Sequence, residues 1–457
     1  MTFQSHIFRT AACIAAALFL GFAGGGNLSA QTSGELEPGA EVDTIQTFGP
    51  GDFKEGYESA DYVTRSLSLL ERRGTRYDLI QFALDPPLGL PSVPIPADNP
   101  LSREKIELGR KLFFDRRLSI NNTFSCAVCH IPEQGFTNNE LNRAVGVEGR
   151  AVLRNSPTIY NVAYQKFLFF DGREFSLENQ VWQPITAHNE MAAPSIGYVI
   201  NKIQRIEEYD ELFAKAFPGQ QANILTIGQA LASYQRTLLS GDSPFDRWRF
   251  GGQNDAVTQD VKQGFGVFAG KGGCIVCHQI GSHTAIFADH KFHNTGLGYS
   301  VSTNLKRKSA DSMTRVQLAP GVYTAISQET IDSITRIKPP NDLGLYRVTE
   351  NPADRWKFRT PSLRNVALTS PYMHNGQFET LEEVIDFYDR GGIQNELLSP
   401  LIRPLGLTDK EKTELVAFLK SLTGSNVKTL VADAFAAPIG ELTENDPNWA
   451  HEKTLGY

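Results

Sequence analysis

The sequence predicts a mainly α-helical protein built from two helical domains that follow each other along the chain. The first reason is a short motif, Cys-x-x-Cys-His, which occurs at residues 126–130 and again at residues 274–278. The second reason is that apolar residues recur at helical spacing before and after each motif. The third is the length of 457 residues, which is enough for two domains of ordinary size.

The repeated motif is the attachment pattern of c-type haem. Its two cysteines form thioethers to the porphyrin edge, and its histidine binds the iron from one side. A lone Cys-x-x-Cys could also be a redox dithiol or half of a zinc site, but the added histidine and the repetition favour haem. We therefore expect two cytochrome-c-like domains, each around one covalently bound haem c. The attachment residues are Cys126, Cys129 and His130 in the first domain and Cys274, Cys277 and His278 in the second.

The N-terminal segment, residues 1–30, has the pattern of a secretory signal peptide. Arg9 precedes an apolar run, and small residues lead to a cleavage point near Ala30. This segment also holds Cys13, the one cysteine outside the motifs. The apolar run is too short for a comfortable membrane span, although an uncleaved anchor is the alternative. Because c-type haem is attached outside the bacterial cytoplasm, we expect a periplasmic protein with no membrane span after cleavage.

The arm and the first domain come next along the chain. Residues 31–100 have little periodic pattern and end in a proline-rich run, which predicts an extended surface arm, with a helix near residues 57–84 as an option. Ser102 can cap the helix that leads into the first motif. Ser243-Pro244 breaks the helical pattern after the last helix of this domain. The further helices predicted here lie at residues 176–182, 196–217 and 224–239.

The second domain repeats this layout. Residues 240–258 form a natural boundary, and a helix at about 260–268 leads into the second motif. Residues 299–342 are polar and irregular, which predicts a long loop or insertion. Two capping boxes, at residues 380–383 and 408–411, start the last two helices, and glycines end both.

These boundaries divide the chain into five parts. The formal net charge of −7 argues against a nucleic-acid partner. The predicted parts are a signal peptide at 1–30, an N-terminal arm at 31–100, a first haem domain at 101–245, a second haem domain at 255–425 that contains the 299–342 insertion, and a C-terminal tail at 426–457.

Several further segments are typical of one protein family. They are Leu-Gly-Arg-Lys-Leu-Phe-Phe-Asp at 108–115, Asn-Ser-Pro-Thr at 155–158, Asp-Gly-Arg at 171–173, Thr-Pro-Ser-Leu-Arg-Asn-Val at 360–366 and Leu-Thr-Ser-Pro-Tyr-Met-His-Asn-Gly at 368–376. Together with the two motifs, they resemble the bacterial dihaem cytochrome c peroxidase and MauG family over about residues 95 to 425. The resemblance implies that the first haem is the peroxide site and that the second is an electron relay.

The resemblance also assigns the groups above the first iron. A peroxidase needs an open iron position and an acid–base group beside it. The distal glutamine and glutamate of the family match Gln180 and Glu190, although a surface carboxylate is the alternative for the glutamate. Family members often carry a histidine that blocks the first iron at rest. No histidine occurs between His130 and His188, so we expect an open first haem, as in the MauG branch.

The second iron is expected to have a different ligand. Conventional dihaem peroxidases place a methionine on the helix after the Pro-Tyr-x-His segment, and the matching residue here is Tyr388. A thioether raises the haem potential, whereas a phenolate favours oxidised iron and is the MauG-like arrangement. A packed tyrosine, hydrogen-bonded to the backbone, is the alternative. The competing ligands are Met373 in second place, then His283, His290, His293 and His374.

A calcium ion between the domains is also implied by the resemblance. Its ligands would be the side chain of Asn155 and the backbone carbonyls of Thr369 and Pro371, since oxygen ligands suit this ion. A turn-capping role is the alternative for Asn155.

One departure from the family concerns electron transfer between the haems. The family normally has a tryptophan directly before Asp-Gly-Arg, and this chain has Phe170. Phenylalanine is harder to oxidise, so electrons would tunnel past it or use Tyr164, Trp182 or Trp248.

The leading hypothesis is a periplasmic dihaem oxidase that uses hydrogen peroxide to oxidise a partner protein, as MauG-like enzymes do to tryptophan. The block at residues 182–191 looks like that of MauG homologues associated with copper handling. The second hypothesis is a conventional cytochrome c peroxidase that takes electrons from a small cytochrome or cupredoxin. The third is a dihaem electron carrier without catalysis. The sequence does not fix the oligomeric state.

Overall fold

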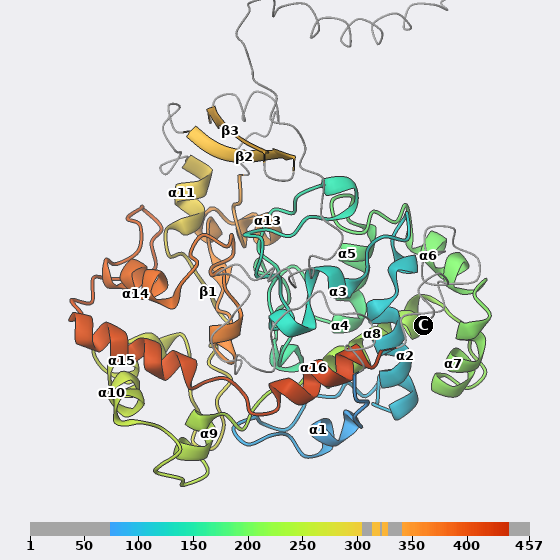
Figure 1. Cartoon of the computed structure of the whole chain (residues 1–457), viewed down its shortest axis with the longest axis horizontal. Coiled ribbons are helices and arrows are strands. Elements are labelled where there is room, and N and C mark those ends of the chain that lie inside the picture. The colour runs from blue at the N-terminus through green and yellow to red at the C-terminus, as the bar shows by residue number, and fades with distance from the viewer. Residues whose placement is uncertain (1–73, 304–312, 320–321, 328–340, 438–457) are drawn as a thin grey trace, which may run out of the picture. The chain divides into compact units, whose positions relative to one another are not determined.

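The computed structural model describes residues 74–303, 313–319, 322–327 and 341–437 (Figure 1). These residues form a mainly α-helical fold, which confirms the predicted class. The predicted signal peptide, with Cys13, and residues 31–73 of the predicted arm lie outside the described residues. In the ranges given above, no helix combines the length and the apolar character that crossing a membrane requires.

The first motif belongs to a group of helices in which α2 (Arg103–Phe114) crosses α8 (Ile224–Arg236). The crossing is close, because a Cβ atom on Gly109 would lie 1.9 Å from the carbonyl oxygen of Ala230. Only glycine allows this approach. Ser102 caps α2 as predicted, by accepting a hydrogen bond from the backbone amide of Lys105. The other elements of this group are η1 (Arg116–Leu118), α3 (Cys126–Cys129), η2 (Pro132–Gln134), η3 (Val147–Gly149), η4 (Val162–Tyr164), α4 (Leu177–Gln180), α5 (Trp182–Thr186), α6 (Ile196–Ile203) and α7 (Glu208–Ala216).

The second motif belongs to a group with the same crossing. Here α10 (Gln259–Ala269) packs on α15 (Asp409–Lys420), and a Cβ atom on Gly264 would lie 1.9 Å from the carbonyl oxygen of Glu414. The two predicted capping boxes are present, with Thr380 before α14 (Leu381–Asp389) and Thr408 before α15. The other elements are α9 (Pro244–Arg249), η5 (Cys274–Val276), β1 (Phe292–His293), α11 (Leu297–Thr303), α13 (Tyr346–Thr349), η6 (Pro352–Asp354), β4 (Phe358–Arg359) and η7 (Val366–Leu368).

The two groups share a further local structure, built on the sequence Asn-Val-Ala. Asn161 and Asn365 both adopt the left-handed conformation, with φ of 59° and 60°. Asn161 accepts a hydrogen bond from the backbone amide of Ser240, shortly after α8, at 2.9 Å. Asn365 accepts one from the backbone amide of Gly424, shortly after α15, at 2.8 Å. Each asparagine therefore fixes the end of the crossing helix in its own domain.

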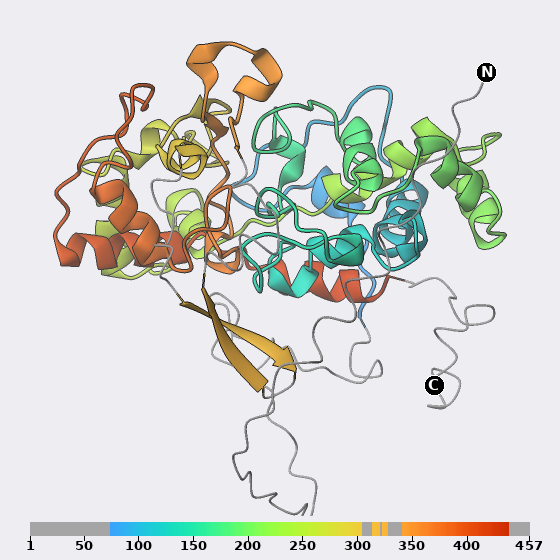
Figure 2. The same cartoon turned by 90° about the horizontal axis from the view of Figure 1, so that it is seen from above.

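The predicted tail, residues 426–457, begins with a helix that packs into the first domain. This helix, α16 (Val427–Phe435), places Leu430 and Val431 in the same hydrophobic cluster as residues of α2 and α8. Its Asp433 forms a buried ion pair with Arg110 of α2, with 3.3 Å between Nε and Oδ2. Figures 1 and 2 show α16 beside the helices of the first domain, although it follows the second domain in the sequence.

Three predicted elements differ from the structure. Residues 196–217 form two helices, α6 and α7, because the chain turns where three acidic residues suit a new helix N-terminus. Ser243-Pro244 ends the helical spacing of the first domain, and it also starts a new helix. Ser243 forms a capping box with Asp246 at the start of α9. The predicted irregular insertion at 299–342 contains the end of α11 and an antiparallel hairpin of β2 (Met313–Ala319) and β3 (Val322–Ser327). The helix suggested near 57–84 is described only in its last part, as α1 (Ile80–Leu84).

Candidate active site

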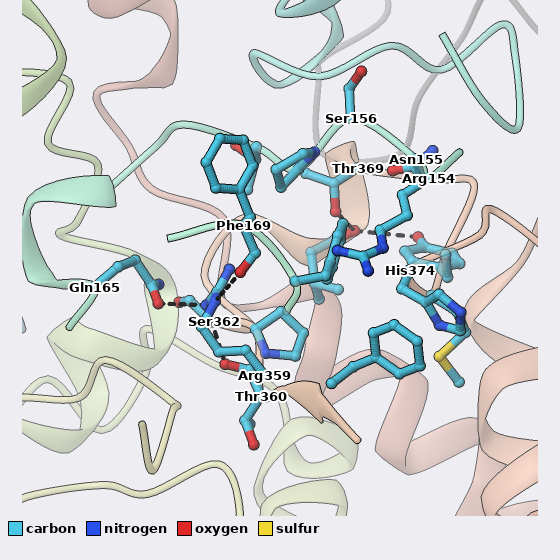
Figure 3. Close-up of a pocket in the computed structure, with 18 of the residues that line it drawn as sticks. Arg154, Asn155, Ser156, Gln165, Phe169, Arg359, Thr360, Ser362, Thr369 and His374 are labelled. Atoms are coloured by element: carbon cyan, nitrogen blue, oxygen red, sulfur yellow. Dashed lines mark hydrogen bonds between the residues drawn. The ribbon is translucent and has the colours of Figure 1, made fainter. Parts of the chain in front are cut away.

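A single cavity of about 900 Å³ is lined by both Cys-x-x-Cys-His motifs. Its size is at the upper end of ordinary cofactor and ligand pockets, which hold roughly 300–1,000 Å³. The wall includes all four motif cysteines and both motif histidines: Cys126, Cys129, His130, Cys274, Cys277 and His278. Figure 3 shows the part of this cavity where residues of the two domains meet.

The two motif histidines are held in the same way. Nδ1 of His130 lies 3.2 Å from the carbonyl oxygen of Phe136, and Nδ1 of His278 lies 2.9 Å from that of Phe287. A histidine that donates from Nδ1 presents Nε2 to a metal, and such a hydrogen bond fixes the orientation of the ring. Both phenylalanines are buried and have positive φ angles, of 51° and 54°. Bulky residues rarely adopt this conformation, so the chain carries backbone strain at the two points where a carbonyl meets a motif histidine.

The motif cysteines also fit covalent haem better than a redox dithiol. All four are free thiols, without a disulfide. Burial raises the pKa of Cys126 and Cys129 to about 12 and that of Cys274 and Cys277 to about 11. A redox Cys-x-x-Cys site usually has a lowered thiol pKa. The residues present therefore fit two haem c groups.

Glu190 lies in the loop after α5 and lines the cavity beside the first motif. Its backbone is fixed on both sides, because its amide donates to the carbonyl of Ala187 and its carbonyl accepts from the amide of Val147, each at 2.9 Å. Burial raises the pKa of Glu190, and the nearby Arg173 acts in the opposite direction. A carboxyl group whose pKa is raised in this way can hold a proton closer to neutral pH.

Gln180 lines the same cavity from the last residue of α4. This short helix is anchored to α8 by Glu178, which pairs with Arg236 at 2.5 Å. A Cβ atom on Gly228 of α8 would lie 2.5 Å from the carbonyl oxygen of Glu178, so the two helices touch closely. The position of Gln180 is therefore set by the core of the first domain.

Tyr388 lines the cavity from α14, near the second motif. Burial raises the pKa of Tyr388, and the nearby Cys277 and Cys274 act in the same direction. Its side chain is partly buried, and its hydroxyl makes no hydrogen bond to any residue in the described part of the chain. Met373 lines the cavity too and packs with Tyr388 in one apolar cluster, so both candidate ligands lie at the second haem site.

The four histidines named as competing ligands lie in different surroundings. His283 is exposed and hydrogen-bonds Ser282, and neither His283 nor His290 lines the cavity. His374 is buried in the cavity wall, where its ring stacks on Phe358 at 3.7 Å between centroids. Burial lowers the pKa of His374 to about 4.

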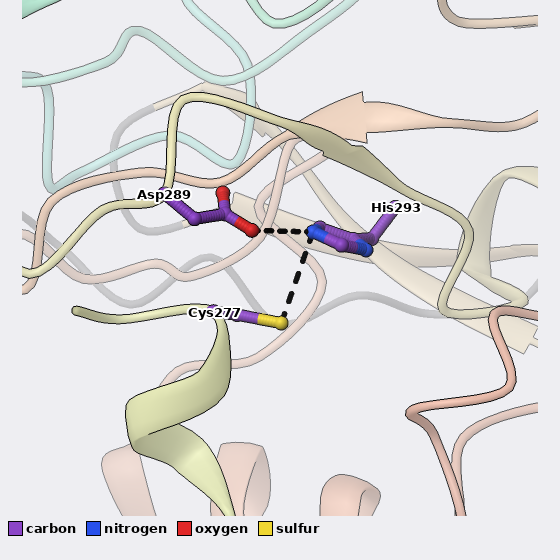
Figure 4. A group of neighbouring side chains, drawn as sticks. All are labelled: Cys277, Asp289 and His293. Carbon is purple, nitrogen blue, oxygen red and sulfur yellow. Dashed lines mark hydrogen bonds and ion pairs between the residues drawn. The ribbon is translucent and has the colours of Figure 1, made fainter.

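His293 belongs to a group of three side chains beside the second motif (Figure 4). Its Nε2 lies 2.7 Å from a carboxylate oxygen of Asp289 and 3.8 Å from Sγ of Cys277. A thioether at Cys277 removes the thiolate that a metal ion would need. This group is therefore a histidine–carboxylate pair at the edge of the second haem site rather than a separate metal site.

The three residues implied for calcium, Asn155, Thr369 and Pro371, all line the cavity. The backbone amide of Asn155 donates to the carbonyl of His374 at 2.8 Å, which joins the two segments. The side-chain amide of Asn155 donates to the carbonyl of Asn142 at 3.1 Å. Figure 3 labels Asn155 of the first domain and Thr369 of the second, which both line this cavity.

The domain junction contains charged residues that the sequence patterns did not indicate. Arg154 of the first domain binds Asp342 of the second at 2.7 Å and Asp171 of its own domain at 2.8 Å. Arg359 is buried in the cavity wall, directly before the Thr-Pro-Ser segment that carried the resemblance. In the sequence, Arg154 and Arg359 are each a basic residue directly before a family segment. This position indicates a role only when the burial of the side chain is also known. Phe170 is buried here as well, with its ring 6.5 Å from that of His374.

Comparison with known proteins agrees with this site. A family model described as di-haem cytochrome c peroxidase matches residues 103–255. Cytochrome-c peroxidase IdrP1 of Pseudomonas sp. strain SCT is 40% identical over 346 residues, which cover 74% of this chain and 86% of that protein. Methylamine utilization protein MauG of Methylorubrum extorquens is 37% identical over 332 residues, which cover 72% and 81%.

Solved structures give the same result for the fold. The crystal structure of a MauG-like protein associated with microbial copper homeostasis matches this chain with a TM-score of 0.62 and 32% identity. The match covers 78% of this chain and 98% of that protein. The chain is thus similar, over most of its length, both to proteins named peroxidases and to proteins named MauG.

Proposed function

This chain belongs to the dihaem cytochrome c peroxidase and MauG family, and from that premise we propose that it is a periplasmic MauG-like enzyme that uses hydrogen peroxide to oxidise a partner protein. Membership of the family makes it a peroxidase-type oxidoreductase with two haem c groups. One observation carries the finer proposal. Within a single cavity, a partly buried carboxyl group with a raised pKa lies beside the first motif, and a phenol without a hydrogen-bond partner in the described residues lies beside the second.

At the first motif, the proposed chemistry depends on Glu190 and Gln180. The haem, when attached, would supply an iron that binds peroxide and gives the two electrons that break the oxygen–oxygen bond, and the partner protein would later replace them. Glu190 takes a proton from the near oxygen of the peroxide and returns it to the far oxygen, which leaves as water. Gln180 orients the peroxide through its amide group. Because the backbone of Glu190 is fixed by two hydrogen bonds, its carboxyl group stays in position between turnovers.

At the second motif, we propose that Tyr388, together with His278, would hold the iron of the second haem. The position beside Cys274 and Cys277, together with a hydroxyl that has no hydrogen-bond partner among the described residues, supports this assignment. A phenolate favours oxidised iron, which suits a haem that stores an oxidising equivalent rather than one that accepts electrons from a donor.

The surface near the second motif supports a protein partner. Val276, Val348 and Leu401 line the cavity and are also exposed, by 49%, 41% and 48%. A protein partner that docks over the cavity would cover such exposed apolar side chains. The solved MauG-like relative is associated with copper homeostasis, so we propose a copper-handling protein as the partner and a tryptophan as the oxidised residue.

We also propose a bound calcium ion and export to the periplasm. Asn155, Thr369 and Pro371 would hold one calcium ion at the domain junction, where oxygen ligands from both domains are available. The signal-like residues 1–30 support a periplasmic location.

The first test is the EPR and optical spectrum of the purified diferric protein. We expect one high-spin and one low-spin signal, with no methionine–iron charge-transfer band. The variant Tyr388→Phe should change only the low-spin signal, because it leaves the first domain untouched. A methionine band, or an unchanged spectrum in this variant, would contradict the tyrosine assignment.

A conventional cytochrome c peroxidase is the second candidate function. The relative with 40% identity is named a cytochrome-c peroxidase, and Met373 lies on the same cavity wall as Tyr388. A methionine band in the spectrum above would favour this function, and peroxide turnover with a small cytochrome or cupredoxin as donor would then be measured directly.

A further inference from the structure

One buried arginine in the described part of the chain differs from all the others. Four arginines there are buried, and three of them bind a carboxylate. For Arg359, no carboxylate of the described residues lies within 4.0 Å of the guanidinium. The three paired arginines are Arg110 with Asp433, Arg236 with Glu178, and Arg364 with Asp246.

The contacts of Arg359 are all with neutral groups. Its side chain is 7% exposed and lines the cavity. Its Nε donates to the carbonyl of Phe169 at 3.2 Å, and its Nη1 donates to the carbonyl of Thr360 at 3.2 Å and to the side-chain carbonyl of Gln165. Figure 3 shows these contacts. All of these bonds come from Nε and Nη1, and none to a described residue comes from Nη2.

These neutral acceptors fix the guanidinium but do not balance its charge. Burial without a nearby anion lowers the pKa of Arg359 to about 10. An arginine side chain nevertheless remains cationic at neutral pH, and a buried cation is stable only when it is paired. The nearby Lys166 is also a cation, and the pKa of His290 is lowered by burial and then by Lys166 and Arg359. Among the described residues no anion balances this charge, and Arg359 lines the cavity, so a group bound in the cavity can supply one.

Arg359 is held by both domains at once. It lies in β4, which pairs with β1 of the second domain, while its backbone amide donates to the carbonyl of Phe170 in the first domain at 2.8 Å. It thus occupies the junction between the two haem sites. The cavity fits two haem groups, and each carries carboxylate side chains that can form two parallel hydrogen bonds with a guanidinium.

We propose that Arg359 is a positioning residue that binds a haem propionate at the domain junction and raises the reduction potential of that haem. A fixed cation beside the propionate cancels its negative charge, so adding an electron to the iron costs less. This inference rests on the two haems of the proposed function and not on its peroxide chemistry. The propionate can come from either haem, and the measurement below distinguishes the two.

The test compares three variants of the holoprotein that carry two haems per chain. Arg359→Gln removes the positive charge and keeps a side-chain amide. Arg359→Lys keeps the charge and loses the two parallel N–H donors of the guanidinium. Arg249→Gln is the control, because it removes the same charge at an exposed position on α9. The midpoint potential of each haem is measured by spectroelectrochemistry at neutral pH, without peroxide.

We expect Arg359→Gln to lower the reduction equilibrium constant of one haem by about tenfold, which is about 59 mV for a one-electron couple. The haem that shifts is the one whose propionate is bound. Arg359→Lys should recover most of the shift, and Arg249→Gln should leave both potentials unchanged. Equal shifts in Arg359→Gln and Arg249→Gln, or no recovery with lysine, would overturn the proposal.

A second measurement applies if Arg359→Gln does not mature with two haems. The propionate bending band in the resonance Raman spectrum reports hydrogen bonding of that group. It should move in Arg359→Lys and stay in place in Arg249→Gln, and an unmoved band in Arg359→Lys would overturn the proposal. If the variants show these shifts while the wild-type protein has no peroxide reactivity, the proposed function is contradicted and the role of Arg359 stands.

Discussion

Glu190 is the residue on which the proposed peroxide chemistry depends most. Acidic residues at the surface of a protein stay ionised in water. Glu190 differs because burial raises the pKa of its carboxyl group, which lies beside the first motif. A base with a raised pKa loses activity as the pH falls through that pKa, because the protonated form cannot accept a proton. The peroxide reaction should therefore slow on the acidic side in the wild type.

The variant Glu190→Gln should keep both haems and lose roughly 100-fold to 10,000-fold in the rate of reaction with peroxide, the usual contribution of a positioned acid–base group. Its remaining rate should no longer depend on acidic pH. Stopped-flow absorbance measures both effects. Glu148→Gln, in the loop that touches the Glu190 segment, is the control, because that side chain is 60% exposed. Full peroxide reactivity in Glu190→Gln would remove this residue from the mechanism.

The residues that carry chemistry could be predicted from the sequence better than the residues that hold them. The motif residues, Glu190 and Tyr388 stand in short patterns that a reader can recognise. Phe136 and Phe287 do not, because nothing in a phenylalanine indicates a positive φ angle. Arg359 was missed for a related reason, since its lack of a carboxylate partner is visible only when burial and neighbours are known.

Helix crossings set the framework around each motif. Gly109 in α2 and Gly264 in α10 each lie where a Cβ atom would meet a backbone carbonyl of the partner helix at 1.9 Å. The α10 helix has a second glycine, Gly266, with no atom within 4 Å of the corresponding position. The two glycines therefore separate the effect of close packing from the effect of helix propensity.

We expect Gly264→Ala to lower the free energy of unfolding by about 1–3 kcal/mol, because α10 and α15 must move apart. Gly266→Ala should raise it by roughly 0.4–1 kcal/mol, since alanine favours the helix and meets no obstacle. Chemical denaturation of the holoprotein, followed by the absorbance of the second haem, measures both. Shifts of the same sign would show that the crossing is not as close as the structure indicates.

At the level of helices and strands, the capped helices could be predicted and the connections between them could not. Ser102, Thr380 and Thr408 mark three helix starts that the structure confirms. The hairpin of β2 and β3 lay in a segment whose polar composition favoured a loop, and strand pairing depends on a partner strand that local composition does not identify. The return of α16 to the first domain is likewise a long-range contact, formed with α2 more than 300 positions earlier.

The whole site depends on how the two domains meet. Arg154 and Arg359 join them through charged and neutral contacts, and the proposed calcium ion would add a third link through Asn155, Thr369 and Pro371. If that ion is present, the junction and the haem geometry should depend on it.

Removal of calcium by a chelator should therefore lower the rate of reaction with peroxide and alter the EPR signal of at least one haem. Adding calcium back should restore both, and magnesium should not, because its smaller octahedral shell fits carbonyl ligands poorly. Asn155→Ala should reproduce the effect of the chelator and should not respond to added calcium. Unchanged rates and spectra after removal of bound calcium, verified by elemental analysis, would contradict the proposed site.

The repeated construction of the two domains has an evolutionary meaning. Each has a glycine at its helix crossing, a left-handed asparagine that fixes the end of the crossing helix, and a left-handed phenylalanine whose carbonyl holds the histidine. Such agreement is what duplication of a single-haem ancestor would leave behind. After duplication, the scaffold that holds each histidine can stay the same, and only the residues opposite it need to diverge. Two copies of one domain can then acquire different functions through few substitutions. To exchange the functions of the two haem sites by design, the residues across the site from one motif histidine are therefore the ones to change.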